Sequence, residues 1–414
     1  MKTLICNMND DMAQACGDVT KLTFDSRKCS WTRRLVDRAA KQDSIQFVSA
    51  HIVVGLYRPF CKQWVYFDQL MNEIPSQQPR FFPLASGERA KDRRSTPSMS
   101  MKGGVVTGVE MVGKSDEIPS QQHLSQCLPN KVIVITDGSN PSCLICDNLP
   151  DLHFVGDSQC FPLYWYEESQ PAGRLLGNDG GGYVCHDAIT DEALAVFREA
   201  YPHAFLGRYK KDGGDELNKE DVFYYVYGVL HSPEYRRRFE TNLKKELPRI
   251  PLAGDFAAFS RAGRALAELH LNYESVEPWG SIEEEGDSTS PGRTVKMRFG
   301  RCKKTDDNPK GVDRTTLHVS EKLMLRGIPE EAYGYVVNGR SAIEWLMDRY
   351  QVRTDKASGI VNDPNEYSDD PRYIVELVER VVTVSMQTLE IVAQLPPLRE
   401  MRQPENWPSA WKAV

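Results

Sequence analysis

The stretch Leu56-Tyr-Arg-Pro-Phe-Cys-Lys-Gln-Trp-Val-Tyr-Phe-Asp68 is the strongest indication of local structure in the chain. The alternation around Trp64, Val65 and Tyr66 favours strands over helices. Arg58 and Lys62 lie in the same stretch, among aromatic residues that can hold a basic side chain rigidly. We therefore expect β structure here, inside a first region that runs from about residue 30 to residue 82.

The pattern on both sides of this stretch predicts an α+β fold. Mixed sheet elements are expected in the N-terminal half and at 290–320, with a helical middle and C-terminal helices. Capping residues and prolines mark the helix starts. The expected helices begin at Thr190, Asn218, Ser232, Asp255, Glu330, Ser341 and Asp370, and the expected strands after the first region lie at Val132–Thr136, Thr294–Phe299 and Thr315–Val319.

The length of 414 residues predicts two subdomains, because a single hydrophobic core stops growing at about 250–300 residues. We expect a leader or linker remnant at 1–29, an N-terminal α+β part at 30–215, a helical and β C-terminal part at 216–398, and a tail at 399–414. The sequence of residues 72–78 is nearly repeated at 116–122, and the stretch between them is rich in Ser, Gly and charge. This pattern indicates a mobile insertion at 84–126.

Charge is distributed unevenly along the chain. The formal net charge is −7, which alone argues against a general nucleic-acid binder. Two segments are nevertheless basic, with 14 Lys and Arg against 7 acids at 25–102 and 10 against 4 at 293–326. Such surfaces can attract phosphate, although solvated faces would give the same composition. No apolar run is long enough for a signal or a membrane helix, so we expect a cytoplasmic protein without membrane contact.

The ten cysteines contain one pair with metal-ligand spacing, Cys143 and Cys146. A structural zinc site needs a second pair, and only Cys160 and the Cys185-His186 dipeptide lie nearby. We therefore expect no metal, and buried cysteines instead of disulfides.

Catalytic motifs are weak or absent. Gly108 to Ser115 matches the phosphate-loop pattern, but Pro119 falls where the following helix would form, so we expect no nucleotide cofactor. No Lys follows an acid at the two-residue spacing of restriction nucleases, and the Asn/Asp-Pro-Pro-aromatic loop of adenine methyltransferases is missing. The three arginines 236–238 wrap around a helix, so at most one is expected to contact phosphate. An autonomous nucleotide hydrolase remains a rival interpretation.

Five ordered stretches resemble the C-terminal region of type ISP restriction-modification enzymes. Together they span the chain from about residue 30 to residue 398. They are Leu56–Asp68, Leu149–Pro162, Val222–Tyr235, Gly327–Trp345 and Gly359–Pro364.

This resemblance implies a target-recognition, or specificity, domain. Type ISP enzymes are single polypeptides in which a nuclease, a helicase-like ATPase and an adenine methyltransferase precede that domain. The resemblance therefore implies a non-catalytic part that reads an asymmetric DNA sequence and positions the target adenine. Its implied partners are double-stranded DNA and the methyltransferase/helicase-nuclease polypeptide. A stand-alone gene, a split subunit and a truncation all remain open.

Six basic residues are the candidates for DNA contact: Arg58, Lys62, Arg33, Arg34, Arg340 and Lys356. Five of them come from the segments that carry the basic composition or the resemblance, and Lys356 lies between two of the resembling stretches. Basic side chains hold phosphates in register. The alternative is an interaction subunit that docks on a methyltransferase or helicase partner without touching DNA. For Arg58, a structural role bracing backbone carbonyls is an equally open interpretation.

Overall fold

The computed structural model describes residues 2–24, 31–68, 71, 78–84, 128–136, 140–169, 182–203, 216–356, 359 and 361–401. Nearly all of the predicted insertion at 84–126 lies outside these residues, and so does the phosphate-loop match at 108–115. Among the helices described, none is both long and apolar enough to cross a membrane.

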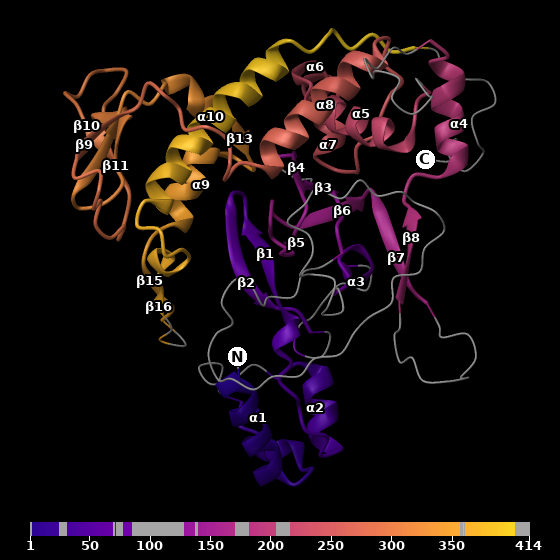
Figure 1. The fold of residues 1–414 in the computed structure, drawn as a ribbon, viewed down its shortest axis with the longest axis vertical. Helices are drawn as coiled ribbons and strands as arrows, with labels where there is room; N and C mark the ends of the chain where they lie inside the picture. The colour runs from indigo at the N-terminus through magenta and orange to yellow at the C-terminus, as the bar shows by residue number, and fades with distance from the viewer. Residues whose placement is uncertain are drawn as a thin grey trace.

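Residues 1–29, expected to be a leader or linker, contribute a packed helix. Helix α1 (Lys2–Ala15) places Ile5, Met8 and Met12 on one face, the spacing of an amphipathic helix. This face packs against α2 (Arg33–Ala40) and against Tyr66 of strand β2. Figure 1 shows the two helices side by side at the indigo end of the chain. The short helices η1 (Val19–Lys21) and η2 (Ser49–His51) complete this part.

The stretch 56–68 contains β structure, as the alternation predicts, and the two strands form a hairpin. Strand β1 (Ile52–Arg58) pairs antiparallel with β2 (Cys61–Tyr66), and the short β5 (Leu149–Pro150) adds to β1 in parallel. Phe60, in the turn, adopts φ +59°, and its carbonyl accepts a hydrogen bond from the Tyr350 hydroxyl. The hairpin turn is thus anchored to the C-terminal half of the chain.

A second sheet separates the two main hydrophobic cores. Its order is β4-β3-β6, with β3 at Val132–Thr136, β4 at Ser142–Cys146 and β6 at Ser158–Pro162. Val132 and Val134 face the core that contains β1, whereas Ile133 and Ile135 face the helical core. This is why all five residues of the strand are buried and its first four are apolar. Helix α3 (Gln78–Phe81) and the pair β7 (Tyr164–Ser169) and β8 (Gly182–Asp187) lie beside it.

The helical middle is built around two helices in close contact. Helix α5 (Lys219–His231) begins with a capping box from Asn218, and α8 (Phe256–Leu271) is capped by Asp255. A Cβ on Gly263 would lie 1.8 Å from the Tyr224 carbonyl oxygen, so the helices approach at glycine. The other helices here are α4 (Asp191–Ala200), α6 (Pro233–Arg238) and α7 (Glu240–Leu243).

The C-terminal part adds a four-stranded sheet and the longest helix described. The sheet order is β10-β11-β12-β9, and Leu317 and Leu325 point from it into the core shared with β1. Its strands are β9 (Glu283–Gly286), β10 (Arg298–Arg301), β11 (Val312–His318) and β12 (Leu323–Arg326). The elements that follow are η5 (Glu330–Gly334), β13 (Val336–Val337), β14 (Arg340–Ser341), α9 (Ala342–Arg349), β15 (Arg353–Thr354), β16 (Val361–Asn362), η6 (Pro364–Glu366) and α10 (Tyr373–Ala393).

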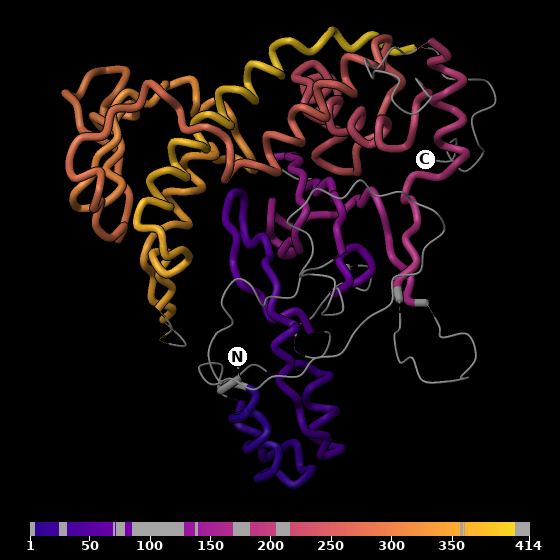
Figure 2. Tube along the Cα trace, viewed as in Figure 1, coloured from indigo at the N-terminus to yellow at the C-terminus, as the bar shows by residue number. Residues whose placement is uncertain are grey.

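Helix α10 connects the two cores. Its first half packs Val375, Val378 and Val382 into the core of β1, and Ile391 and Val392 contact the helical core. Figure 2 shows this helix crossing the upper side of the molecule, from α9 toward α8. The fold class expected from the sequence, α+β with helices in the middle and at the C-terminal end, is confirmed.

Candidate nucleic-acid interface

Helix α9 holds arginines that come from three different strands. Glu344 and Asp348 lie four residues apart, so they share one face of the helix. Arg314 of β11 pairs with Glu344 at 3.3 Å. Arg340 of β14 and Arg353 of β15 both pair with Asp348, at 2.8 and 2.5 Å. The helix face therefore collects three guanidinium groups that come from three different strands.

Aromatic rings hold two of these arginines in place. The guanidinium of Arg340 lies 5.2 Å from the ring centroid of Trp345, and that of Arg314 lies over Phe299 and Tyr333. Such stacking is favourable for a planar cation. The side chains of the three arginines are nevertheless 48–50% exposed. Each is therefore fixed in orientation and still open to a ligand.

Two further arginines extend the group toward the β1–β2 hairpin. Arg349 also bonds to Asp348, and its guanidinium lies 5.9 Å from the Tyr57 ring centroid. Arg58 lies over the same ring at 4.2 Å and pairs with Asp151 at 3.2 Å. Both side chains are only 19% exposed. The Tyr57 ring thus connects the hairpin to α9, because it contacts an arginine from each.

We call this set the arginine track: Arg58, Arg314, Arg340, Arg349 and Arg353. Its five guanidinium groups share three paired carboxylates, those of Asp151, Glu344 and Asp348. The chain as a whole carries a negative net charge.

The electrostatics of Asp348 fit its position among arginines. Burial raises the pKa of its carboxyl, but hydrogen bonds and charge from Arg349 and Arg353 outweigh burial and hold that pKa below the ordinary 3.8. Asp348 is therefore ionised at neutral pH and keeps the arginines in place. The pairs are partly exposed, so they orient the side chains more than they stabilise the fold.

The structure brings together some of the candidates from the sequence and separates others. Arg58 and Arg340 belong to the arginine track, and Lys356 is exposed just beyond β15. Lys62 pairs with Glu274 at 2.5 Å and approaches the Tyr273 ring, and it forms no part of the track. The remaining two candidates, Arg33 and Arg34, are exposed on α2 in the N-terminal part. Whether any of the six contacts DNA stays a prediction.

Sequence reasoning missed Arg314, Arg349 and Arg353. Arg314 pairs with Glu344, which lies on a different element, whereas Arg349 and Arg353 pair with the nearby Asp348. One signal was present: the capping box of Ser341 and Glu344 fixes the start of α9, and Asp348 follows one turn later. An acid pair on a short helix with arginines on both sides would have pointed to the track.

The Cys143-x-x-Cys146 pair is not arranged for a metal. Residues three apart on a strand point to opposite faces of the sheet. Cys143 accordingly faces the helical core, whereas Cys146 faces the core of β1. Within the residues that the structure describes, no group of three or more His, Cys, Asp or Glu side chains could hold a metal ion.

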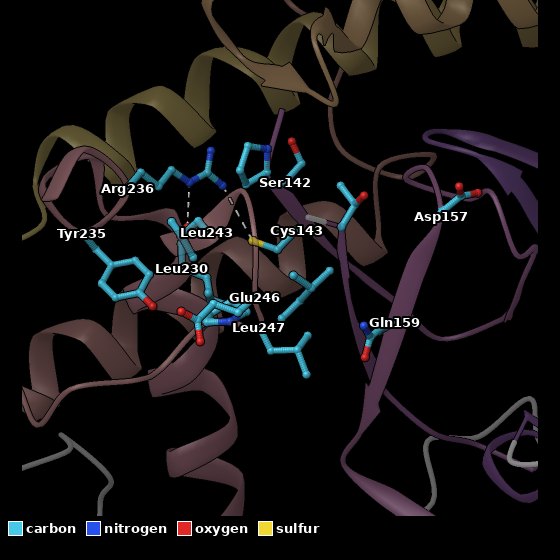
Figure 3. Close-up of a pocket in the computed structure, with 14 residues that line it drawn as sticks. Ser142, Cys143, Asp157, Gln159, Leu230, Tyr235, Arg236, Leu243, Glu246 and Leu247 are labelled. Atoms are coloured by element: carbon cyan, nitrogen blue, oxygen red, sulfur yellow. Dashed lines mark hydrogen bonds between the residues drawn. The ribbon is translucent and has the colours of Figure 1, made fainter. Parts of the chain in front are cut away.

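A small hollow beside α6 is too small for a base or a nucleotide. It encloses about 30 Å³, whereas ligand pockets usually measure about 300–1,000 Å³. Figure 3 shows Arg236 pointing toward this hollow, where Nε donates to the Leu230 carbonyl and Nη2 lies 3.7 Å from Cys143 Sγ. Arg238 pairs with Glu400. These two of the three consecutive arginines therefore have structural partners.

Clustered basic side chains are one feature of domains that bind nucleic acid. The sequence profile of the Type ISP C-terminal specificity domain matches residues 1–91 and 115–377. The chain belongs to this family. The unmatched residues 92–114 lie within the insertion expected from the sequence.

Solved structures with the same fold agree with this assignment. The ATP-dependent Type ISP restriction-modification enzyme LlaBIII bound to DNA is 31% identical, with a TM-score of 0.73 over 97% of this chain. A nuclease-deletion mutant of the Type ISP enzyme LlaGI with a DNA substrate mimic is 32% identical, with a TM-score of 0.69 over 96%. The DrdV-DNA complex is 25% identical, with a TM-score of 0.67 over 97%.

This chain corresponds to only part of those proteins. It spans 22% of the LlaBIII chain, 31% of the LlaGI mutant and 33% of DrdV. No curated protein sequence is significantly similar to it.

Proposed function

We propose that this domain reads a specific sequence in double-stranded DNA through the arginine track, and positions the target adenine for a methyltransferase domain. The observation that carries the proposal is the joint anchoring of Arg314, Arg340 and Arg353 on the two acids of α9. The family assignment supports it, and so do the three similar structures, all described as DNA complexes.

The chemistry of the track suits base reading. A guanidinium can donate two parallel hydrogen bonds to O6 and N7 of guanine, the most common specific contact in the major groove. Arg340 and Arg353 each use part of their donor set on Asp348 and leave the rest exposed. Because their orientation is already fixed, less side-chain entropy is lost when DNA binds.

The proposal assigns no catalytic step to this chain. It would act with a methyltransferase/helicase-nuclease polypeptide, in the cytoplasm where its DNA substrate lies. ATP hydrolysis, DNA cleavage or adenine methylation by the purified chain, abolished by a substitution in the chain itself, would contradict this part.

Selection from a randomised duplex library tests sequence reading. The wild-type chain, with the methyltransferase polypeptide added in a parallel arm, should enrich one asymmetric sequence. Arg340→Ala/Arg353→Ala should relax the preference at individual positions, because each bidentate pairing between arginine and guanine supplies about 1–3 kcal/mol of discrimination against the wrong base.

A matched control is the pair Arg238→Ala/Arg249→Ala, which removes two exposed, ion-paired arginines outside the track. The control should enrich the wild-type sequence. If the wild type binds the partner polypeptide but neither arm enriches a sequence, the docking alternative replaces the proposed function.

A further inference from the structure

The connection between β10 and β11 carries basic side chains that differ from those of the track. Arg301, Lys303, Lys304 and Lys310 are all exposed. Among the residues that the structure describes, no acid forms an ion pair with any of the four, whereas every arginine of the track has an acidic partner. Two exposed acids, Asp306 and Asp307, lie in the same connection, so four bases face two acids. We call residues 301–311 the lysine loop.

The lysine loop is held in shape by its own backbone and one asparagine. The Asn308 side chain donates to the Val312 carbonyl at 2.7 Å and accepts from the Val312 amide at 3.1 Å. The Cys302 amide donates to the Gly311 carbonyl at 3.1 Å. Gly311 adopts φ +58°, and a Cβ there would lie 2.6 Å from the Cys302 carbonyl oxygen. The loop therefore presents its charges from a defined backbone.

A β-bulge ties the lysine loop to the arginine track. Phe299 of β10 pairs with Leu317 of β11, but the next residue, Gly300, pairs with Asp313. The three residues 314–316 of β11 therefore have no pairing partner on β10. Bulges bend a strand and redirect its side chains. Arg314 is one of these three residues, and its guanidinium reaches Glu344 of α9. The loop and the track are thus connected through a single strand.

We propose that the lysine loop is a second binding site, which takes the phosphates of duplex DNA beside the base-reading track. This inference rests on the proposed function. Lysine ammonium groups are mobile point charges that suit phosphate, whereas planar guanidinium groups suit base edges. The free lysines can neutralise phosphates without first breaking an ion pair. The lysines therefore contribute the same binding free energy for every DNA sequence.

The salt dependence of DNA binding tests the inference. The probe is a fluorescently labelled duplex of random sequence, titrated with the 414-residue chain at several salt concentrations. Each phosphate neutralised steepens the logarithmic salt dependence by about 0.9. Lys303→Gln/Lys304→Gln should lower that slope by about 1–2 units. The melting temperature should stay unchanged, because these side chains make no hydrogen bond or ion pair with the described residues.

Lys244→Gln/Lys245→Gln is the matched control, since it removes another adjacent pair of exposed lysines, after α7. This control should keep the wild-type slope. If the lysine-loop variant also keeps that slope while the wild type still selects a sequence, the inference is overturned and the proposed function stands. If the wild type binds no duplex even at low salt, the proposed function fails, and the inference with it.

Discussion

Arg340 on β14 donates through Nη1 to Oδ2 of Asp348 on α9, at 2.8 Å. The other oxygen of the same carboxylate accepts from Arg353 on β15, at 2.5 Å. One carboxylate thus joins two hairpins that follow each other in the chain and orients both of their arginines. Asp348 is therefore a positioning residue, which orients the guanidinium groups of Arg340 and Arg353.

Asp348→Asn should weaken the fold only modestly and in a pH-dependent way. We expect a loss of about 1–2 kcal/mol in unfolding free energy at neutral pH, since exposed pairs contribute about 0.2–1 kcal/mol each. The folded pKa of Asp348 lies below 3.8, so its contribution is present above that pH and is lost as pH falls through the folded value. Urea denaturation of the wild type and the variant, at neutral and at acidic pH, measures this difference in unfolding free energy.

Asp369→Asn is the control, because Asp369 is exposed and forms no ion pair with any described residue. It should match the wild type at every pH. A difference between Asp348→Asn and wild type that persists unchanged below pH 3.8 would show that the effect does not come from the charge.

Arg58→Ala addresses the two interpretations of that residue. Its Nη1 donates to the Tyr57 carbonyl and to Asp151, and the side chain is largely buried. We expect a loss of about 1 kcal/mol in stability, together with a salt slope lower by about one unit for all sequences alike. Thermal melting measures the loss of stability, and titration with duplex DNA at several salt concentrations measures the salt slope. A large drop in melting temperature with an unchanged slope would make Arg58 purely structural.

His270→Gln should reduce the acid sensitivity of the fold. Burial lowers the pKa of His270 to about 3, and its ring bridges the Tyr227 hydroxyl and Thr388 Oγ1. The unfolded chain binds a proton below about pH 6.5 and the folded chain does not, so stability falls as pH drops. Between pH 7 and 5 the wild type should lose about 2 kcal/mol more than the variant, by urea denaturation. Equal losses would contradict the buried, neutral assignment.

Gly263→Ala should separate α5 from α8. A Cβ at this position would lie 1.8 Å from a backbone oxygen, which no rotamer change can relieve. We expect a loss of at least about 2 kcal/mol in unfolding free energy. Gly280→Ala is the control, because a Cβ there meets nothing within 4 Å. If both variants unfold at the same urea concentration as the wild type, α5 and α8 do not pack closely at Gly263.

Local signals in the sequence predicted much of the fold. Asn218 and Asp255 cap their helices as expected, because a cap depends only on residues a few positions away. The alternation near Trp64 predicted β structure there for the same reason, although not the pairing of β1 with β2. Helix α1 was missed because the N-terminus was searched only for a signal sequence, although Ile5, Met8 and Met12 follow a helical period.

The candidate site was less accessible to sequence reasoning. Arg58 and Lys62 looked equivalent in sequence, yet Lys62 meets Glu274, a partner 212 positions away, and Arg58 joins the track. Long-range pairing of this kind leaves no periodic trace. The basic composition of 293–326 did reflect a charged sheet edge, but only the structure connects Arg314 to Glu344.

Chemical modification of arginine tests most directly whether the arginine track faces DNA. Phenylglyoxal labelling, read by peptide mass spectrometry, can be compared with and without saturating duplex DNA. Arg314, Arg340 and Arg353 should be protected by DNA, whereas Arg237, exposed on α6, should be labelled equally in both samples. If the three track arginines are labelled to the same extent with bound DNA as without it, the track does not contact DNA.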